Sequence, residues 1–217
     1  MGEAGLIRIT APISIGDAFL PEFTGDMRKR LPQITFDSDL SNETRDFDKD
    51  EIDFALRTME VEEPELIARY LGRLRDSIVC TPAMAKALKL KHPSQLSEQE
   101  CILTSTETRW NVWNLISAKE EIQIQVSGKI STSQYLSAKQ FALKGYGITR
   151  LPTHSISSEL KSGLLVELFP NYEVTTHPLY LVYSKNVSQS HSHQIVRDWL
   201  LKWFKNKPEF FANVNRK

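Results

Sequence analysis

The order of apolar and polar residues in the first quarter of the chain constrains the fold most. Residues 6–9 form a short apolar run, and apolar side chains then recur every three or four residues over 14–31, which predicts a strand followed by an amphipathic helix. Residues 34–40 alternate apolar and polar, and 52–57 are again largely apolar, as in two further strands. Strand–helix–strand order is typical of parallel sheets with right-handed crossovers. The sequence therefore predicts an α/β protein.

The rest of the chain continues this alternation. Further strands are predicted at 66–71, 77–81, 102–104, 122–126, 148–151, 164–166 and 179–183. Further helices are predicted at 83–88, 133–143, 153–160 and 192–205. Ser14, Thr81 and Ser133 are predicted N-caps, because Ser and Thr side chains accept hydrogen bonds from the first free amides of a helix.

Length and charge exclude several classes of protein. The 217 residues allow one large domain or two lobes of roughly 100 residues each. The 27 basic and 27 acidic side chains give a net charge of zero, which argues against a freestanding nucleic-acid-binding protein. No apolar run approaches the ~18–20 residues of a membrane span, and the N-terminus carries no apolar signal core.

The two cysteines are too few for a secreted disulfide framework. Cys80 ends one apolar run and Cys101 begins another, which favours two buried thiols in strands. A redox pair is the alternative, and it would need Cα atoms within about 7 Å. A reducing cytoplasm fits both interpretations.

Signatures of catalysis, cofactors and metals are missing from the sequence. It contains no G-x-S-x-G, H-E-x-x-H or P-loop motif, and residues 145–147 lack the third glycine of a dinucleotide fingerprint. Residues 191–193 (His-Ser-His) and the acidic run 60–65 are interpreted as solvated loops, although each could in principle bind a cation. Trp110 and Trp113 are interpreted as packing aromatics, with ligand stacking as the alternative. We therefore expect no cofactor, no metal and no enzyme activity.

Small hydroxyl residues gather where predicted strands lead into helices, at 10–14, 41–42, 104–106 and 131–133. In open parallel sheets, ligands bind beyond the carboxyl ends of the strands, where helix N-termini supply free amides. The clusters thus predict a site for a small polar or anionic molecule. The alternative is that these side chains only cap helices.

An ordered set of motifs over nearly the whole chain resembles one family. The motifs are GLIRITAP at 5–12, IDFALR at 52–57, LIARYL at 66–71, TP at 81–82, QL at 95–96, CI at 101–102, ALKGYGITRLP at 142–152 and LKSGLLV at 160–166. They resemble the effector-binding domain of LysR-type transcriptional regulators. Glu100 stands where that family usually has a histidine.

The resemblance implies a two-lobed fold like that of type 2 periplasmic binding proteins. Two mixed, mostly parallel sheets, each flanked by helices, are joined by two crossover segments. Residues 1–75 and 176–217 would form lobe I, and residues 76–175 lobe II. The family's N-terminal winged helix-turn-helix is expected to be absent from this chain.

The resemblance also implies which residues bind the effector. A carboxylate at the helix start near Ser14 would gain about 1 kcal/mol from the amides and dipole, and Gly147 would line the floor of the cleft between the lobes. The complete set is Thr10, Pro12, Ser14, Ile15, Gly16, Ser41, Asn42, Thr104, Ser105, Ser131, Thr132, Ser133 and Gly147.

The implied function is effector sensing. A small molecule bound in the cleft would bias hinge closure and signal to a DNA-binding domain, which alone would contact DNA. The domain would be cytoplasmic, independent of membranes, and paired as a homodimer through residues 15–31 of one copy and 133–144 of the other, within a tetramer of the intact regulator. A solute-binding receptor of a transport system with the same fold is the alternative, and a secretion signal would favour it. An enzyme of this architecture would need catalytic groups that converge in the cleft.

Overall fold

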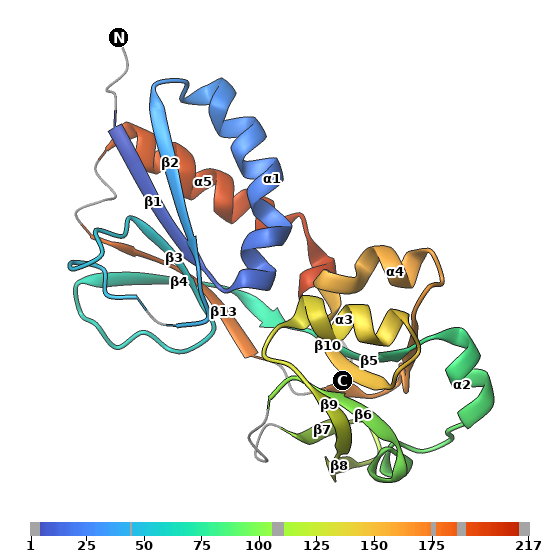
Figure 1. Ribbon diagram of the computed structural model, residues 1–217. Helices are drawn as coiled ribbons and strands as arrows, with labels where there is room; N and C mark the ends of the chain where they lie inside the picture. The colour runs from blue at the N-terminus through green and yellow to red at the C-terminus, as the bar shows by residue number, and fades with distance from the viewer. Residues whose placement is uncertain (1–4, 44, 106–110, 175–176, 186–189, 213–217) are drawn as a thin grey trace. The chain divides into compact units, whose positions relative to one another are not determined.

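The chain folds into two compact units, which are described separately (Figure 1). The computed structural model describes residues 5–43, 45–105, 111–174, 177–185 and 190–212. The first unit comprises Met1–Arg73 and His177–Pro208, and the second comprises Leu74–Thr176 and Glu209–Lys217. This division differs at its C-terminal end from the expected lobe boundary, which placed all of 176–217 in lobe I.

The first unit is built on a five-stranded sheet with the order β2-β1-β3-β13-β4. Its strands are β1 (Gly5–Ala11), β2 (Ile34–Leu40), β3 (Phe54–Arg57), β4 (Leu66–Leu74) and β13 (His177–Ser184). Strand β1 lies between β2 and β3 and runs parallel to both, whereas β13 runs antiparallel to β3. The opening strand–helix–strand pattern therefore produces the parallel pairs that it predicted.

Helices α1 (Ile13–Arg30) and α5 (His191–Lys205) cover one face of this sheet (Figure 1). They are joined by aromatic packing, in which Phe23 meets Trp199 edge-on and Phe19 meets Trp203 edge-on. The indole of Trp203 donates a hydrogen bond to Glu22 over 2.7 Å. On the other face of the sheet a smaller cluster contains Phe47, Ile52, Ala55 and Val182.

The second unit has a five-stranded sheet with the order β11-β5-β10-β6-β9 and a three-stranded sheet with the order β12-β7-β8. The strands are β5 (Asp76–Cys80), β6 (Glu100–Leu103), β7 (Val112–Ile116), β8 (Glu121–Gln125), β9 (Ser127–Ser131), β10 (Ile148–Pro152), β11 (Val166–Leu168) and β12 (Glu173–Val174). The helices are α2 (Pro82–Leu88), α3 (Tyr135–Leu143) and α4 (Ser157–Lys161), with short 3-10 helices at Pro93–Glu98 (η1), Thr153–Ile156 (η3) and Pro208–Phe210 (η5).

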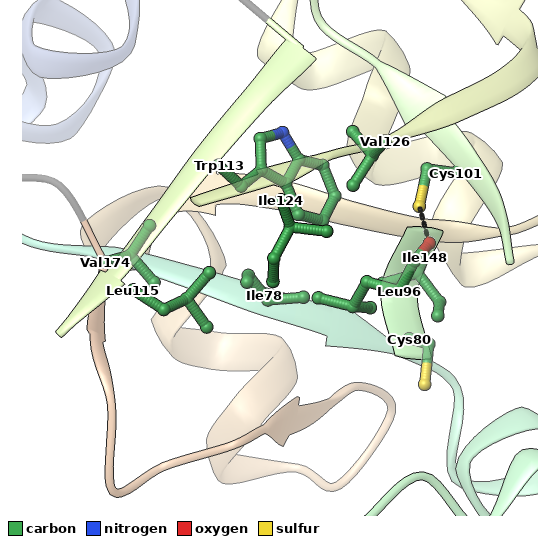
Figure 2. Close-up of a cluster of buried hydrophobic side chains, with 10 residues drawn as sticks. All are labelled: Ile78, Cys80, Leu96, Cys101, Trp113, Leu115, Ile124, Val126, Ile148 and Val174. Carbon is green, nitrogen blue, oxygen red and sulfur yellow. Dashed lines mark hydrogen bonds between the residues drawn. The ribbon is translucent and has the colours of Figure 1, made fainter. Parts of the chain in front are cut away.

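Each face of the larger sheet in the second unit has its own apolar core. One core lies between this sheet and the three-stranded sheet, with Ile78, Leu96 and Trp113 buried together (Figure 2). The other lies under α3, where Ala138 and Ala142 pack against Leu151. Trp113 is therefore a packing aromatic as predicted, while Trp110 lies outside the described residues.

Three strands (β7, β9 and β12) and several helix starts differ from the sequence prediction. Strands β7 and β9 were not predicted, because Gly128 and Lys129 interrupt any apolar alternation in β9 and the tryptophan pattern dominates β7. Residues 191–193 are not a loop. They begin α5, and His193 Nε2 lies 3.0 Å from Asp53 Oδ1. The α/β fold class with mixed sheets is confirmed.

Candidate functional site

The first group of predicted residues lies where parallel strands β1 and β2 end. Ala11 pairs with Leu40, and the Ser41 amide donates to the Ala11 carbonyl over 3.0 Å, so Pro12 and Ser41 follow neighbouring strands at one edge. Asn42 is exposed at the same edge. We call this edge the first polar edge.

The start of α1 differs from the prediction. Ser14 was predicted to be the N-cap, but α1 begins at Ile13 and Pro12 occupies the cap position without a side-chain hydrogen bond. The Pro12 carbonyl instead accepts from the amides of Ile15 and Gly16, over 3.0 and 2.9 Å. Ser14 therefore lies inside the first turn of the helix, half-buried. Its hydroxyl does not make the N-cap hydrogen bond that the sequence predicted.

Three other predicted residues of this group belong to the packing of the unit. Ile15 is buried in the core, and Thr10 is buried within β1. A Cβ atom on Gly16 would lie 2.2 Å from Leu40 Cδ2, so the absence of a side chain lets α1 pack against the end of β2. These three residues therefore support the fold next to the first polar edge, and we do not count them among its exposed polar groups.

The second group lies where parallel strands β6 and β9 end. Leu103 pairs with Ser131, and the Thr132 amide donates to the Leu103 carbonyl over 2.9 Å. Thr104 and Thr132 therefore follow adjacent strands at one edge, and both are half-buried. Ser105 follows directly and is half-buried, while Thr106 lies outside the described residues. We call this edge the second polar edge.

Ser133 is at the second polar edge but does not cap the helix. Helix α3 begins at Tyr135, with Gln134 at the cap position and no side-chain cap hydrogen bond. The Thr132 hydroxyl instead accepts a hydrogen bond from the Gln134 amide over 3.3 Å, which forms a local turn before the helix. Ser131 and Ser133 are exposed.

Gly147 is not at the second polar edge. It precedes β10, whose first residue Ile148 pairs with Cys101 near the start of β6, so Gly147 lies at the opposite edge. A Cβ atom there would lie 2.7 Å from the Glu100 carbonyl oxygen. The glycine therefore allows β10 to approach β6 closely, which is a packing requirement.

Sequence reasoning missed a polar group at the second polar edge. Strand β10 is parallel to β6 and ends there, and antiparallel β5 begins there, with Asp76 opposite Pro152. The buried Ser77 hydroxyl lies 2.8 Å from the Thr153 hydroxyl and donates to Glu167 over 2.7 Å. The only sequence signal was a charged and hydroxyl pair, Asp76-Ser77, at the entry to an apolar strand.

A charged pair lies beside this polar group, which the sequence did not predict. Arg150 Nε lies 3.6 Å from Asp76 Oδ2, and each side chain is only 13% exposed. Burial raises the pKa of Tyr135, at the start of α3, and the negative charge of Asp76 raises it further. The Tyr135 phenol therefore stays protonated at neutral pH and can donate a hydrogen bond.

The described residues contain no cluster of three or more His, Cys, Asp or Glu side chains placed to hold a metal ion. Across the same part of the chain, no helix is long and apolar enough to cross a membrane.

Comparison with known proteins assigns a family. The LysR substrate binding domain family matches residues 1–205. The HTH-type transcriptional activator TtdR of Escherichia coli K12 is 24% identical over 205 residues, which cover 92% of this chain and 64% of that protein. The HTH-type transcriptional regulator DmlR of the same strain is 24% identical, over 92% of this chain and 66% of that protein. The chain thus spans slightly less than two thirds of these relatives.

Solved structures show the same fold. Full-length AphB, a Vibrio cholerae virulence activator of the LTTR family, superimposes with a TM-score of 0.81 at 21% identity, over 94% of this chain and 69% of that one. The regulatory domain of CrgA from Neisseria meningitidis, a LysR-type transcriptional regulator, gives a TM-score of 0.77 at 19% identity, over 93% of this chain and 100% of that one. The two-lobed α/β architecture predicted from the sequence is therefore confirmed, and the chain belongs to the LysR substrate binding domain family.

Proposed function

We propose that this chain is the effector-sensing domain of a LysR-type transcriptional regulator. A small polar or anionic effector binds at the polar edges, and its binding is passed to a DNA-binding domain. Family membership supports the regulatory role. The observation that carries the binding proposal is the pair of half-buried threonines, Thr104 and Thr132, at adjacent strand ends.

The two polar edges suit a small ligand with several oxygen atoms. Hydroxyl side chains both donate and accept hydrogen bonds, so they can bind hydroxyl, carbonyl and carboxylate groups. At the first polar edge Ser14 lies in the first turn of α1, where backbone amides and the helix dipole favour negative charge. At the second polar edge Tyr135 and Arg150 add a phenol and a guanidinium. We therefore favour an effector that carries at least one carboxylate.

The signal depends on differential affinity. A ligand shifts the equilibrium between two conformations of the protein only to the extent that it binds one conformation more tightly than the other.

A transport receptor and an enzyme are both less well supported. A transport receptor with the same fold would bind its solute in a similar way, but the matched relatives are named as transcriptional regulators. At the two polar edges we propose binding without turnover, in a domain that acts in the cytoplasm.

A thermal-shift screen of small hydroxy acids, keto acids and amino acids would test the binding proposal. A ligand at 100 times its dissociation constant stabilises the folded state by about 2.7 kcal/mol. For a compound that raises the melting temperature, Ser14→Ala and Thr104→Val should each weaken binding about tenfold, since a lost hydrogen bond to a ligand costs on the order of 1 kcal/mol.

Matched controls lie at the opposite ends of the same sheets. Thr35→Val changes an exposed residue near the start of β2, and Ser127→Ala changes an exposed residue at the start of β9. Both control variants should bind the compound like the wild type. If Ser14→Ala and Thr104→Val also left the shift unchanged, the polar edges would not be the binding site.

A further inference from the structure

One histidine in the second unit connects a serine hydroxyl to a carboxylate. His92 precedes η1, and its Nδ1 lies 2.9 Å from the Ser94 hydroxyl. Its other ring nitrogen, Nε2, lies 2.9 Å from Oε1 of Glu120, in the turn between β7 and β8. The three side chains lie in the order serine, imidazole and carboxylate, which is the order of a nucleophile, its base and the group that orients the base.

The backbone fixes the direction of each hydrogen bond. The Ser94 amide donates to His92 Nδ1 over 3.3 Å, and an amide can only donate, so Nδ1 carries no proton in the neutral ring. The proton of the neutral ring is then on Nε2, which donates to Glu120. Because Nδ1 is an acceptor, the Ser94 hydroxyl must be the donor in its own contact with this nitrogen.

The carboxylate end of the group is also held in place. The Tyr172 hydroxyl, which precedes β12, donates to the same Glu120 oxygen as His92. This hydrogen bond, with the one from His92, holds the pKa of Glu120 below its usual value, so the side chain remains an anion. The Glu120 amide donates to Ser117 Oγ over 3.2 Å, which orders the turn that carries Glu120.

Helix capping explains only part of this arrangement. The His92 side chain accepts from the Ser94 amide, and the Gln95 side chain accepts from the His92 amide, which completes a capping box for η1. A cap needs neither the Ser94 hydroxyl nor a carboxylate on the far ring nitrogen. Ser94 is exposed and the His92 side chain is 43% exposed, so a reagent in solution can reach the hydroxyl.

We propose that Ser94 is a nucleophilic serine, with His92 as its general base, and that small activated acyl donors such as aryl esters and acyl phosphates modify it. The Ser94 oxygen attacks the acyl carbon while its proton passes to His92 Nδ1. The bond from that carbon to the leaving oxygen then breaks, and the imidazolium releases the proton to the leaving group or to water. The product is an O-acyl serine. This chemistry is independent of effector binding at the polar edges.

Acetylation by p-nitrophenyl acetate tests the proposal on the intact chain. Acetyl occupancy at each serine is followed over time by mass spectrometry of proteolytic peptides. Ser97 is the internal control, because it lies in the same 3-10 helix and its hydroxyl donates to the Ser94 carbonyl over 2.9 Å. General-base assistance is typically worth about 10²–10⁴-fold, so Ser94 should be acetylated at least about 100-fold faster than Ser97.

Two variants separate base catalysis from capping. His92→Asn keeps a side-chain acceptor for the η1 amides, since Asn is a favoured N-cap, but removes the base, and Ser94 acetylation should fall to the rate of Ser97. Glu120→Gln leaves the imidazole in place and should slow Ser94 acetylation about tenfold. Equal rates at Ser94 and Ser97 in the wild type, or an undiminished Ser94 rate in His92→Asn, would overturn the proposal.

Discussion

The two cysteines are inert because of where their side chains lie. Both thiols are free and buried, on β5 and β6 of the second unit (Figure 2). Burial raises the pKa of Cys80 to about 11, and burial together with the negative charge of Glu100 raises the pKa of Cys101 to about 12. The thiolate is the reactive form of cysteine, so both groups are almost entirely in the unreactive form at neutral pH.

We expect neither cysteine to react with a thiol reagent while the chain is folded. In native buffer, Ellman's reagent should label Cys80 and Cys101 at least a hundredfold more slowly than a free thiol, and after unfolding in urea it should label both at once. Rapid labelling of either thiol in the native protein would contradict this expectation and would reopen the redox-pair interpretation.

Helix caps show how far single residues could be predicted. Thr81 was predicted correctly, and its hydroxyl accepts from the Met84 amide over 3.3 Å, with Pro82 in the first helical position. Ser14 and Ser133 were not. Pro12 already has the extended backbone that a cap position needs, so α1 starts two residues earlier than an N-cap at Ser14 implies. A turn closed by Thr132 delays α3 to Tyr135. In both helices the start is set by the backbone geometry of neighbouring residues. The type of a single residue does not specify that geometry.

At the scale of elements, strand β9 shows why some of the sheet was unpredictable. Its sequence, Ser-Gly-Lys-Ile-Ser, has the exposure of an edge strand and no apolar alternation. The pairing depends on Gly128, where a Cβ atom would lie 1.7 Å from the Cys101 carbonyl oxygen and where the register with β6 is irregular. A contact between positions so far apart in sequence leaves no local pattern.

Gly128→Ala should therefore separate β6 from β9. The added methyl meets backbone, which cannot rotate away, so we expect the variant to lose about 1–3 kcal/mol of unfolding free energy in urea. It should also disturb Thr104 and Thr132, which follow these strands, and weaken any effector bound there. Ser127→Ala, on the neighbouring exposed position, should leave the unfolding free energy within about 0.5 kcal/mol of the wild type. Equal stability of the two variants would show that the strands can adjust.

A shielded ion pair connects α3 with α4. Lys139 Nζ lies 3.0 Å from Glu159 Oε1, and the side chains are 18% and 14% exposed. Burial acts to raise the pKa of Glu159, but hydrogen bonds from Ser158 and Lys139 outweigh it and hold the pKa below its usual value. A carboxyl with a lowered folded-state pKa adds stability above its unfolded pKa and loses it as the pH falls through the folded pKa.

Glu159→Gln should therefore be less stable than the wild type at pH 7, by about 1–2 kcal/mol in urea unfolding. The difference should shrink as the pH falls below about 4.3, the usual pKa of an unfolded glutamate. Glu98→Gln, an exposed change in η1, should follow the wild type within about 0.5 kcal/mol at both pH values. A difference between Glu159→Gln and wild type that grew in acid would reverse the assigned sign.

At the scale of the whole molecule, the parallel strands explain which site residues could be predicted. Polar residues that follow β1 and β2, or β6 and β9, meet at one edge because the carboxyl ends of parallel strands coincide. Asp76 and Ser77 reach the same edge only because β5 runs antiparallel to β10, and strand direction cannot be read from a short apolar run. Gly147 was misplaced for a related reason, since it precedes its strand.

The homodimer that the family resemblance implies makes a prediction about two separate surfaces. The outer face of α1 is hollowed at Pro21, Thr24 and Gly25, and a methyl group added to Gly25 meets no described atom within 4 Å. No packing inside the described chain accounts for a glycine in this helix, where it costs about 1 kcal/mol relative to alanine. On α3, Leu136 is 62% exposed. A hollow on one helix and a projecting apolar side chain on another are the features that a pairing of α1 with α3 from a second copy requires.

Leu136→Glu should therefore weaken self-association at least about tenfold, which corresponds to about 1.4 kcal/mol, because a carboxylate in this contact would lose its hydration. Sedimentation equilibrium of the purified chain measures this directly. Leu164→Glu is the matched control, since Leu164 is 58% exposed but lies in the loop after α4 and belongs to neither helix of the proposed contact. If the two variants associated equally well, the exposed leucine of α3 would have no special role, and the pairing implied by the family would have to use another surface of this chain.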